Sequence, residues 1–185
     1  MTEIHKSCCF IGHRDANLSA QELDVLKNII ENLILKEKVK DFLFGSKSKF
    51  NEISHKIVTE LKEKYTYIER KFYNLRSEYC VLESERLNLE KIMSTTLRKD
   101  VKLMGMEGEV SFSKKLNTTV NSYIVRNQAM IDNSDYCIFY YDENYLPIIK
   151  KKNQSNISGT KIAYEYALKK KKLIINVYNF KSTIV

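Results

Sequence analysis

The chain has 185 residues, of which 43% are hydrophobic and 29% are charged. That length and balance exclude a disordered or fibrous chain and predict a single domain, 1–185, with a buried core. The formal net charge of +8 could attract nucleic acid or a phosphorylated ligand. Much of the excess charge lies in two lysine runs, 150–152 and 169–172, for which a solvated surface is the alternative.

Localisation and thiol chemistry follow from what the sequence lacks. No apolar run approaches the ~20 residues of a membrane helix, and the first residues do not resemble a signal peptide. The four cysteines include no C-x-x-C pair. Cys8 and Cys9 are adjacent in an apolar run that predicts a strand, so their side chains should point to opposite faces. We expect buried thiols, with a metal or redox role as the alternative, in a cytoplasmic protein that does not bind membranes.

Apolar periodicity in the first half of the chain predicts three strands and two helices. The strands are expected at 6–11, 41–44 and 65–73. Ser19 is expected to cap the first helix and Asn51 the second. The apolar side of the first helix comprises Leu23, Leu26, Ile30, Leu33 and Ile34, and that of the second comprises Ile53, Ile57, Val58 and Leu61.

The second half of the chain continues the alternation after an irregular stretch. Residues 73–116 lack a sustained period, and the sequence does not indicate their role. We then expect a helix from about residue 116 to Met130, a strand at 137–141, a helix opened by Ser158 and a strand at 173–177. This order predicts an α/β fold: a Rossmann-like, doubly wound and mostly parallel sheet of about five strands with helices on both faces.

Ligands of such sheets bind outside the carboxyl ends of the strands, where the strand order reverses. The rule selects the residues that directly follow the predicted strands, namely Gly12, His13, Arg14, Gly45, Ser46 and Asp142. Histidine and arginine offer donors suited to a phosphate or a sugar hydroxyl. The alternative is that both glycines only form turns and that Arg14 is solvated.

A second group of candidates lies on the two later helices. The turn Ser158-Gly159-Thr160 opens a helix, where unpaired backbone N–H groups favour an anion, although Ser158 could simply be a cap. Arg126, beside Asn127, could clamp a phosphate or form a surface salt bridge. Glu165 could act as a general base if burial raises its pKa, or it could be an exposed surface residue.

Several classes of active site have no support in the sequence. No histidine has a partner at metal spacing, and neither H-E-x-x-H nor G-x-S-x-G occurs. We therefore expect no bound metal and no cofactor.

Three segments carry a resemblance to a known family. Residues 8–14 are similar to C-x-F-x-G-H-R, residues 126–135 to R-N-x-x-M-(I/V)-D-x-S-D, and residues 158–167 to G-G-T-x-x-A-x-x-Y-A. In these motifs the chain resembles the SLOG superfamily of Rossmann-like domains, and within it the bacterial YpsA-like group. The resemblance implies a nucleotide-derived ligand at the Gly-Thr turn.

Relatives in this superfamily fall into different functional classes. LOG enzymes are phosphoribohydrolases, DprA binds single-stranded DNA, and some SLOG domains of phage-defence proteins sense a cyclic ADP-ribose signal. The LOG patterns are R-K-x-x-M and P-G-G-x-G-T-x-x-E; here Asn127 replaces the lysine and Ala163 replaces the catalytic glutamate. Glu165 lies two residues later, roughly 200° around a helix.

The first hypothesis is therefore a binding or sensing domain for a nucleoside phosphate or an ADP-ribose-like molecule. It requires the amides near Gly159 and the Arg126 guanidinium to converge on one anion. The second is a nucleotide N-glycosidase that uses Arg126 and Glu165 as catalytic residues. Nucleic-acid binding through the lysine runs ranks third, because aromatic residues are not interleaved with them. The sequence leaves homo-oligomer formation open.

Overall fold

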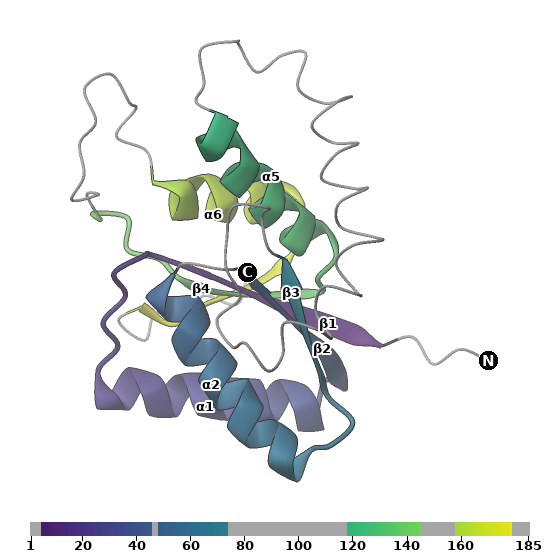
Figure 1. The fold of residues 1–185 in the computed structure, drawn as a ribbon. Helices are drawn as coiled ribbons and strands as arrows, with labels where there is room; N and C mark the ends of the chain where they lie inside the picture. Colours follow the sequence, from purple (N-terminus) through teal and green to yellow (C-terminus); the bar gives the residue numbers. More distant parts are fainter. Residues whose placement is uncertain (1–4, 46–47, 74–117, 146–157, 179–185) are drawn as a thin grey trace.

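The computed structural model describes residues 5–45, 48–73, 118–145 and 158–178 (Figure 1). Its elements, in chain order, are β1 (Lys6–Gly12), α1 (Ala20–Leu35), β2 (Val39–Gly45), α2 (Lys49–Lys64), β3 (Glu69–Tyr73), α5 (Thr118–Asp132), β4 (Tyr136–Tyr140), α6 (Gly159–Lys169) and β5 (Leu173–Asn176). The expectations for 74–117, for the loop at 146–157 and for Cys80 and Ser46 fall outside the described residues.

The five strands form one parallel sheet in the order β3-β2-β1-β4-β5. Phe10 of β1 pairs in register with Phe44 of β2 and with Ile138 of β4. The chain builds outward from β1 in one direction and then, from β4, in the other, so the strand order reverses between β1 and β4. The predicted doubly wound, Rossmann-like fold is confirmed.

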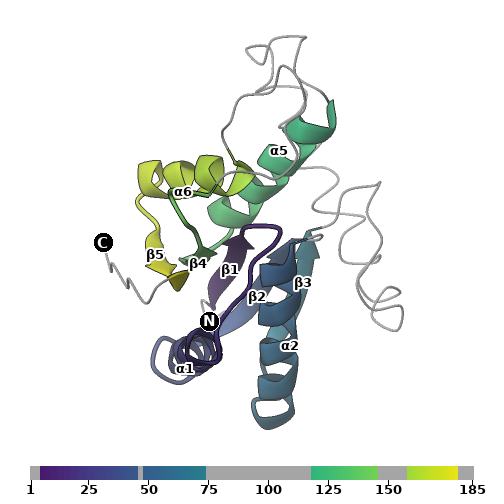
Figure 2. The ribbon, with the colours of Figure 1, turned by 90° about the vertical axis from the view of Figure 1, so that its left-hand side faces the viewer.

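Helices cover both faces of the sheet (Figures 1 and 2). Strand residues alternate between the faces, so Phe10, Phe42 and Phe44 pack with α1 and α2, while Leu43 and Phe139 pack with α5 and α6. The fully buried Cys8 and Cys9 belong to these two separate cores, as predicted from their adjacency. Burial raises the pKa of the Cys8 thiol well above its usual range.

Local signals set most helix starts. Ser19 forms a capping box with Glu22 at the start of α1, and the Ser158 side chain accepts a hydrogen bond from the Lys161 amide at the start of α6. The prediction that Asn51 caps α2 is wrong, because Ser48 is the N-cap. Asn51 lies in the first turn, and its Oδ1 instead accepts a hydrogen bond from the Gly45 amide at 2.9 Å.

One strand boundary and the exposure of one helix residue also differ from the predictions. The third strand begins at Glu69 rather than at residue 65, because Tyr65 still ends α2 and its carbonyl accepts a hydrogen bond from the Ile68 amide. Leu23 was expected on the buried side of α1 but is 36% exposed, while Leu26 and Ile30 are fully buried. The other predicted members, Leu33 and Ile34, are also buried, so only Leu23 departs from the predicted stripe of α1.

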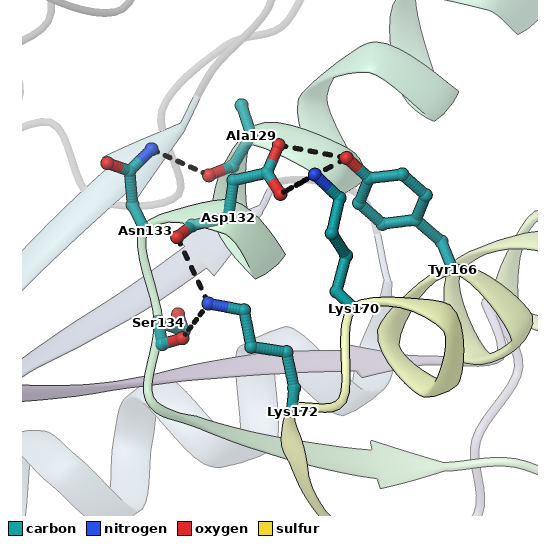
Figure 3. Close-up of polar contacts among 7 residues, drawn as sticks. All are labelled: Ala129, Asp132, Asn133, Ser134, Tyr166, Lys170 and Lys172. Carbon is teal, nitrogen blue, oxygen red and sulfur yellow. Dashed lines mark hydrogen bonds and ion pairs between the residues drawn. The ribbon is translucent and has the colours of Figure 1, made fainter.

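Polar contacts join α5 to α6 near their C-terminal ends (Figure 3). The carboxylate of Asp132 accepts a hydrogen bond from the Tyr166 hydroxyl at 2.9 Å and pairs with Lys170 at 3.2 Å. Lys172 donates to the backbone carbonyls of Asp132 and Ser134. The second lysine run is therefore only partly a solvated surface, since two of its members fix the two helices beside the start of β4.

This arrangement orients both helices. Asp132 and Lys170 lie at the edge where the strands begin, so the N-terminal ends of α5 and α6 lie toward the edge where the strands end, called here the carboxyl edge. Within the described ranges, no helix has the length and apolarity needed to cross a bilayer.

Candidate functional site

At the carboxyl edge, β1 and β4 end side by side. The amide of His13, just beyond β1, donates to the Tyr140 carbonyl at 3.3 Å, so the two strands stay paired to their last residues. Because the strand order reverses here, the connections leave in opposite directions, which is the usual origin of a ligand site in this fold. His13 and Gly45 both follow or end strands at this edge, as predicted.

Gly12 has a packing role on the face of the sheet that α1 and α2 cover. A Cβ at this position would lie 2.6 Å from two ring carbons of Phe50, which is fully buried at the start of α2. Only glycine leaves room for that ring. The side chain of the neighbouring Arg14 is exposed, while its carbonyl accepts a hydrogen bond from the Lys49 amide. These contacts fit the structural alternative for both residues.

His13 is buried, with 2% of its surface exposed. Its Nε2 lies 2.9 Å from the Asp142 amide, which donates to it, and its ring stacks on Tyr145 at a centroid distance of 3.9 Å. Burial lowers the pKa of His13, so the imidazole is held in its neutral form. Asp142 takes part through its backbone, whereas its carboxylate accepts a hydrogen bond from the Asn144 amide and closes the turn after β4.

Arg126 of α5 reaches the end of β2. A Cβ on Gly45 would lie 3.1 Å from the Arg126 Cζ and 3.2 Å from its Nε, so the guanidinium packs directly on the glycine. Arg126 is only 6% exposed, and both Nε and Nη2 lie 3.4 Å from the Asn127 Oδ1. Arg126 therefore occupies a buried position rather than the protein surface.

An aromatic pair stands on the other side of β1, and sequence reasoning missed it. Tyr141, directly after β4, stacks on Tyr164 of α6 with ring centroids 4.6 Å apart, and Tyr164 also meets the edge of Phe139. Burial raises the pKa of Tyr141, and the nearby Glu165 carboxylate adds to this effect. The tyrosines were visible in the sequence, but their pairing depends on how α6 lies across the sheet.

Glu165 does not meet the condition set for its catalytic role. Ala163 and Ala167 form the buried side of α6, and Glu165 lies about 200° from each around the helix. Its side chain is accordingly exposed. The burial that would turn it into a general base is absent.

The turn at Ser158 is both a cap and an open helix end. The Ser158 Oγ accepts a hydrogen bond from the Lys161 amide at 3.1 Å, and Thr160 is buried. Apart from its chain neighbours and the backbone of its own helix, no atom of the described residues lies within 4 Å of where a Cβ of Gly159 would stand. Since Tyr164 already touches the residue that follows β4, the Ser158 turn lies about one and a half helical turns further out, beyond the carboxyl edge.

The structure therefore brings predicted residues and the aromatic pair together along the carboxyl edge. Arg126 lies over the end of β2, His13 follows β1, and the Tyr141–Tyr164 pair lies at the end of β4. Neighbouring strands are about 4.8 Å apart, so the two flanks of this surface are separated by about 10 Å. The convergence of Arg126 and the Gly159 amides on a single anion stays a prediction.

The described residues contain no group of three or more His, Cys, Asp or Glu side chains placed to hold a metal ion. The chain matches no known protein-family model, and no curated protein matches it either.

Proposed function

We propose that the protein binds or senses a nucleotide-derived ligand at the carboxyl edge between β2 and β4. The observation that carries the proposal is the buried guanidinium of Arg126 packed on Gly45, at the carboxyl end of β2 and one strand from the point where the strand order reverses and ligands of doubly wound folds bind. A planar guanidinium with several fixed donors suits a phosphate, which it can bind through two parallel hydrogen bonds. The proposed ligand class is a nucleoside phosphate or an ADP-ribose-like molecule.

The two flanks of the surface suit the two ends of such a ligand. Arg126 on one flank favours negative charge, while the stacked Tyr141 and Tyr164 on the other offer ring faces of the kind on which planar groups pack. A separation of about 10 Å between the flanks is compatible with one nucleotide lying across the end of β1. The resemblance to the SLOG superfamily supports the same ligand class, and membership of that superfamily is part of the proposal.

Binding is favoured over hydrolysis because Glu165, the candidate acid–base residue, lacks the environment that this role needs. Glu165 is exposed, and the position that carries glutamate in LOG enzymes is the buried Ala163. An acid–base residue needs a pKa shifted toward neutrality, usually by burial. Incubation with AMP, GMP, CMP and NAD, followed by chromatography, should therefore release no free base.

A thermal-shift screen with AMP, GMP, CMP, NAD and ADP-ribose tests the binding itself. A ligand present at 100 times its Kd stabilises the folded protein by about 2.7 kcal/mol. At least one member of the panel should raise the melting temperature, and Arg126→Gln should reduce that shift. Lys36→Gln, which removes an exposed lysine at the far end of α1, serves as the charge-matched control. No shift with any member would contradict the proposal.

A further inference from the structure

The position of the proton on His13 follows from two contacts of its Nε2. This atom lies 2.9 Å from the Asp142 backbone amide and 3.2 Å from the Asp142 backbone carbonyl. A backbone N–H is a permanent donor and makes the shorter contact, so we assign Nε2 as the acceptor of the amide hydrogen bond. The proton of the neutral ring therefore resides on Nδ1, which becomes a donor.

That donor is buried and has no hydrogen-bond partner among the described residues. The great majority of buried polar side-chain atoms are paired, and an exception calls for an explanation such as a binding role or an ordered water. The ring is held at Nε2 by the Asp142 backbone, stacks on Tyr145 at a centroid distance of 3.9 Å and is tilted against Tyr141 at 5.9 Å. The fold therefore fixes the position of the ring, and its Nδ1–H is the group that remains to be paired with an acceptor.

We infer that the Nδ1–H of His13 donates a hydrogen bond to an oxygen atom of the bound ligand. This inference rests on the proposed function and names a contact within it. His13 follows β1, about one strand spacing from the Arg126 flank and one from the Tyr141 flank, so it lies beneath the middle of a ligand that spans both. A neutral N–H at that place suits a sugar hydroxyl or a phosphate oxygen, the acceptors of a nucleotide between its base and its outer phosphate.

Tyr145 covers one face of the His13 ring, whereas the Nδ1–H lies in the plane of that ring. Its hydroxyl donates to an exposed oxygen of Asp15 at 3.2 Å, and the ring is otherwise held by stacking on His13. A single exposed hydrogen bond contributes little to stability. The ligand oxygen therefore approaches the His13 ring at its edge, while the Tyr145 ring can stay stacked on its face.

Nuclear magnetic resonance of the ¹⁵N-labelled full chain observes this proton directly. The chain has three histidines, so the His13 signals can be assigned by comparison with His13→Gln. The free protein should show the tautomer protonated at Nδ1. Titration with AMP or ADP-ribose should shift the Nδ1 resonance and slow exchange of its proton. A tautomer protonated at Nε2, or an unchanged Nδ1 in protein that calorimetry shows to be saturated, would overturn the inference.

Two substitutions of His13 distinguish the contribution of its Nδ1–H donor from that of the rest of the side chain. Asparagine places its amide nitrogen near the position of Nδ1, whereas glutamine reaches toward the position of Nε2. His13→Gln should weaken AMP binding by about tenfold, the effect of one lost hydrogen bond, and His13→Asn should weaken it less. His5→Gln, at an exposed position, is the control. Equal affinity of wild type and both His13 variants would overturn the inference.

Comparing AMP with adenosine shows which ligand oxygen His13 binds, and it separates a failure of the proposed function from a failure of the inference about His13. If His13→Gln lowers the affinity for AMP but not for adenosine, the bound oxygen belongs to the phosphate. If it lowers the affinity for both equally, the oxygen belongs to the nucleoside. If no nucleotide binds the wild-type protein, the proposed function fails and this inference with it. If a nucleotide binds without affecting Nδ1, only the inference fails.

Discussion

The guanidinium of Arg126 rests on Gly45 so closely that an added Cβ would lie 3.1 Å from its central carbon. The described glycines have no positive φ angle, so Gly45 is not required by the backbone conformation. The close approach of a helix side chain to the end of β2 is therefore the feature that glycine permits here. It connects the sheet edge to the residue that we propose binds phosphate.

Gly45→Ala should weaken the binding of AMP by about threefold to tenfold, because the new methyl group displaces the guanidinium by a few tenths of an ångström. The free energy of unfolding should stay within about 1 kcal/mol of wild type, since alanine fits the backbone angles. Calorimetric titration of the single and double variants checks the coupling. In an Arg126→Gln background the glycine substitution should have no further effect on affinity, and an undiminished effect there would exclude the proposed route through Arg126.

Gly12→Ala should act on stability instead. Its Cβ would lie 2.6 Å from two carbons of the fully buried Phe50 ring, which cannot move away without disturbing the start of α2. We expect a loss of about 1–3 kcal/mol in urea unfolding, as for other overpacked cores. Combining it with Phe50→Leu should recover part of that loss. A stability equal to wild type in Gly12→Ala would show that the glycine has no packing role.

Lys171→Gly should stabilise the protein. Lys171 follows α6 with φ of 54°, and the Lys171 and Lys172 amides donate to the Leu168 and Ala167 carbonyls, which together form a Schellman motif. Glycine adopts this left-handed conformation without the steric cost that lysine bears. The expected gain is about 0.5–1 kcal/mol in urea unfolding. Lys169→Gly, inside the helix, should instead destabilise by about 1 kcal/mol, and equal effects at the two positions would refute the conformational explanation.

The fold was predictable because its signals are local. Strand–helix alternation and the caps at Ser19 and Ser158 can be found in short windows of sequence, and the structure confirms them. Asn51 was misassigned because asparagine is a favoured cap, while its true partner, the Gly45 amide, becomes visible only when the loop is closed. The strand-end rule selected His13 and Gly45. It could not select Tyr164, whose partner Tyr141 belongs to another element.

The functional interpretation of single residues was less predictable than their position. Nothing in the sequence distinguishes a buried Arg126 from an exposed one. Which side of α5 is buried depends on how the helix packs against the end of β2. Glu165 was ambiguous for the same reason. Once Ala163 is placed against the sheet, helix geometry places Glu165 on the exposed side.

Acidification should destabilise the protein through His13. Burial lowers its pKa in the folded state below the unfolded value of about 6.5, so the unfolded chain binds a proton more readily. This contribution to stability is complete above pH 6.5 and is lost as the pH falls below it, by up to about 1.4 kcal/mol per pH unit for one proton. Urea unfolding between pH 7 and pH 5 measures the slope. The slope should be smaller in His13→Gln, and an unchanged slope in that variant would assign it to other groups.

The most direct test of the account compares the affinities of AMP and adenosine by isothermal titration calorimetry, in wild type and in Arg126→Gln. Removing one charge-assisted hydrogen-bonding partner typically changes the binding free energy by about 1.5–3 kcal/mol, or roughly ten- to more than a hundredfold in Kd. We predict that the wild type prefers AMP to adenosine by about tenfold or more and that Arg126→Gln, still folded by its melting curve, loses that preference. Equal affinity for both ligands in the wild type, or a full preference for AMP in the variant, would contradict the assignment of Arg126 as the phosphate-binding residue.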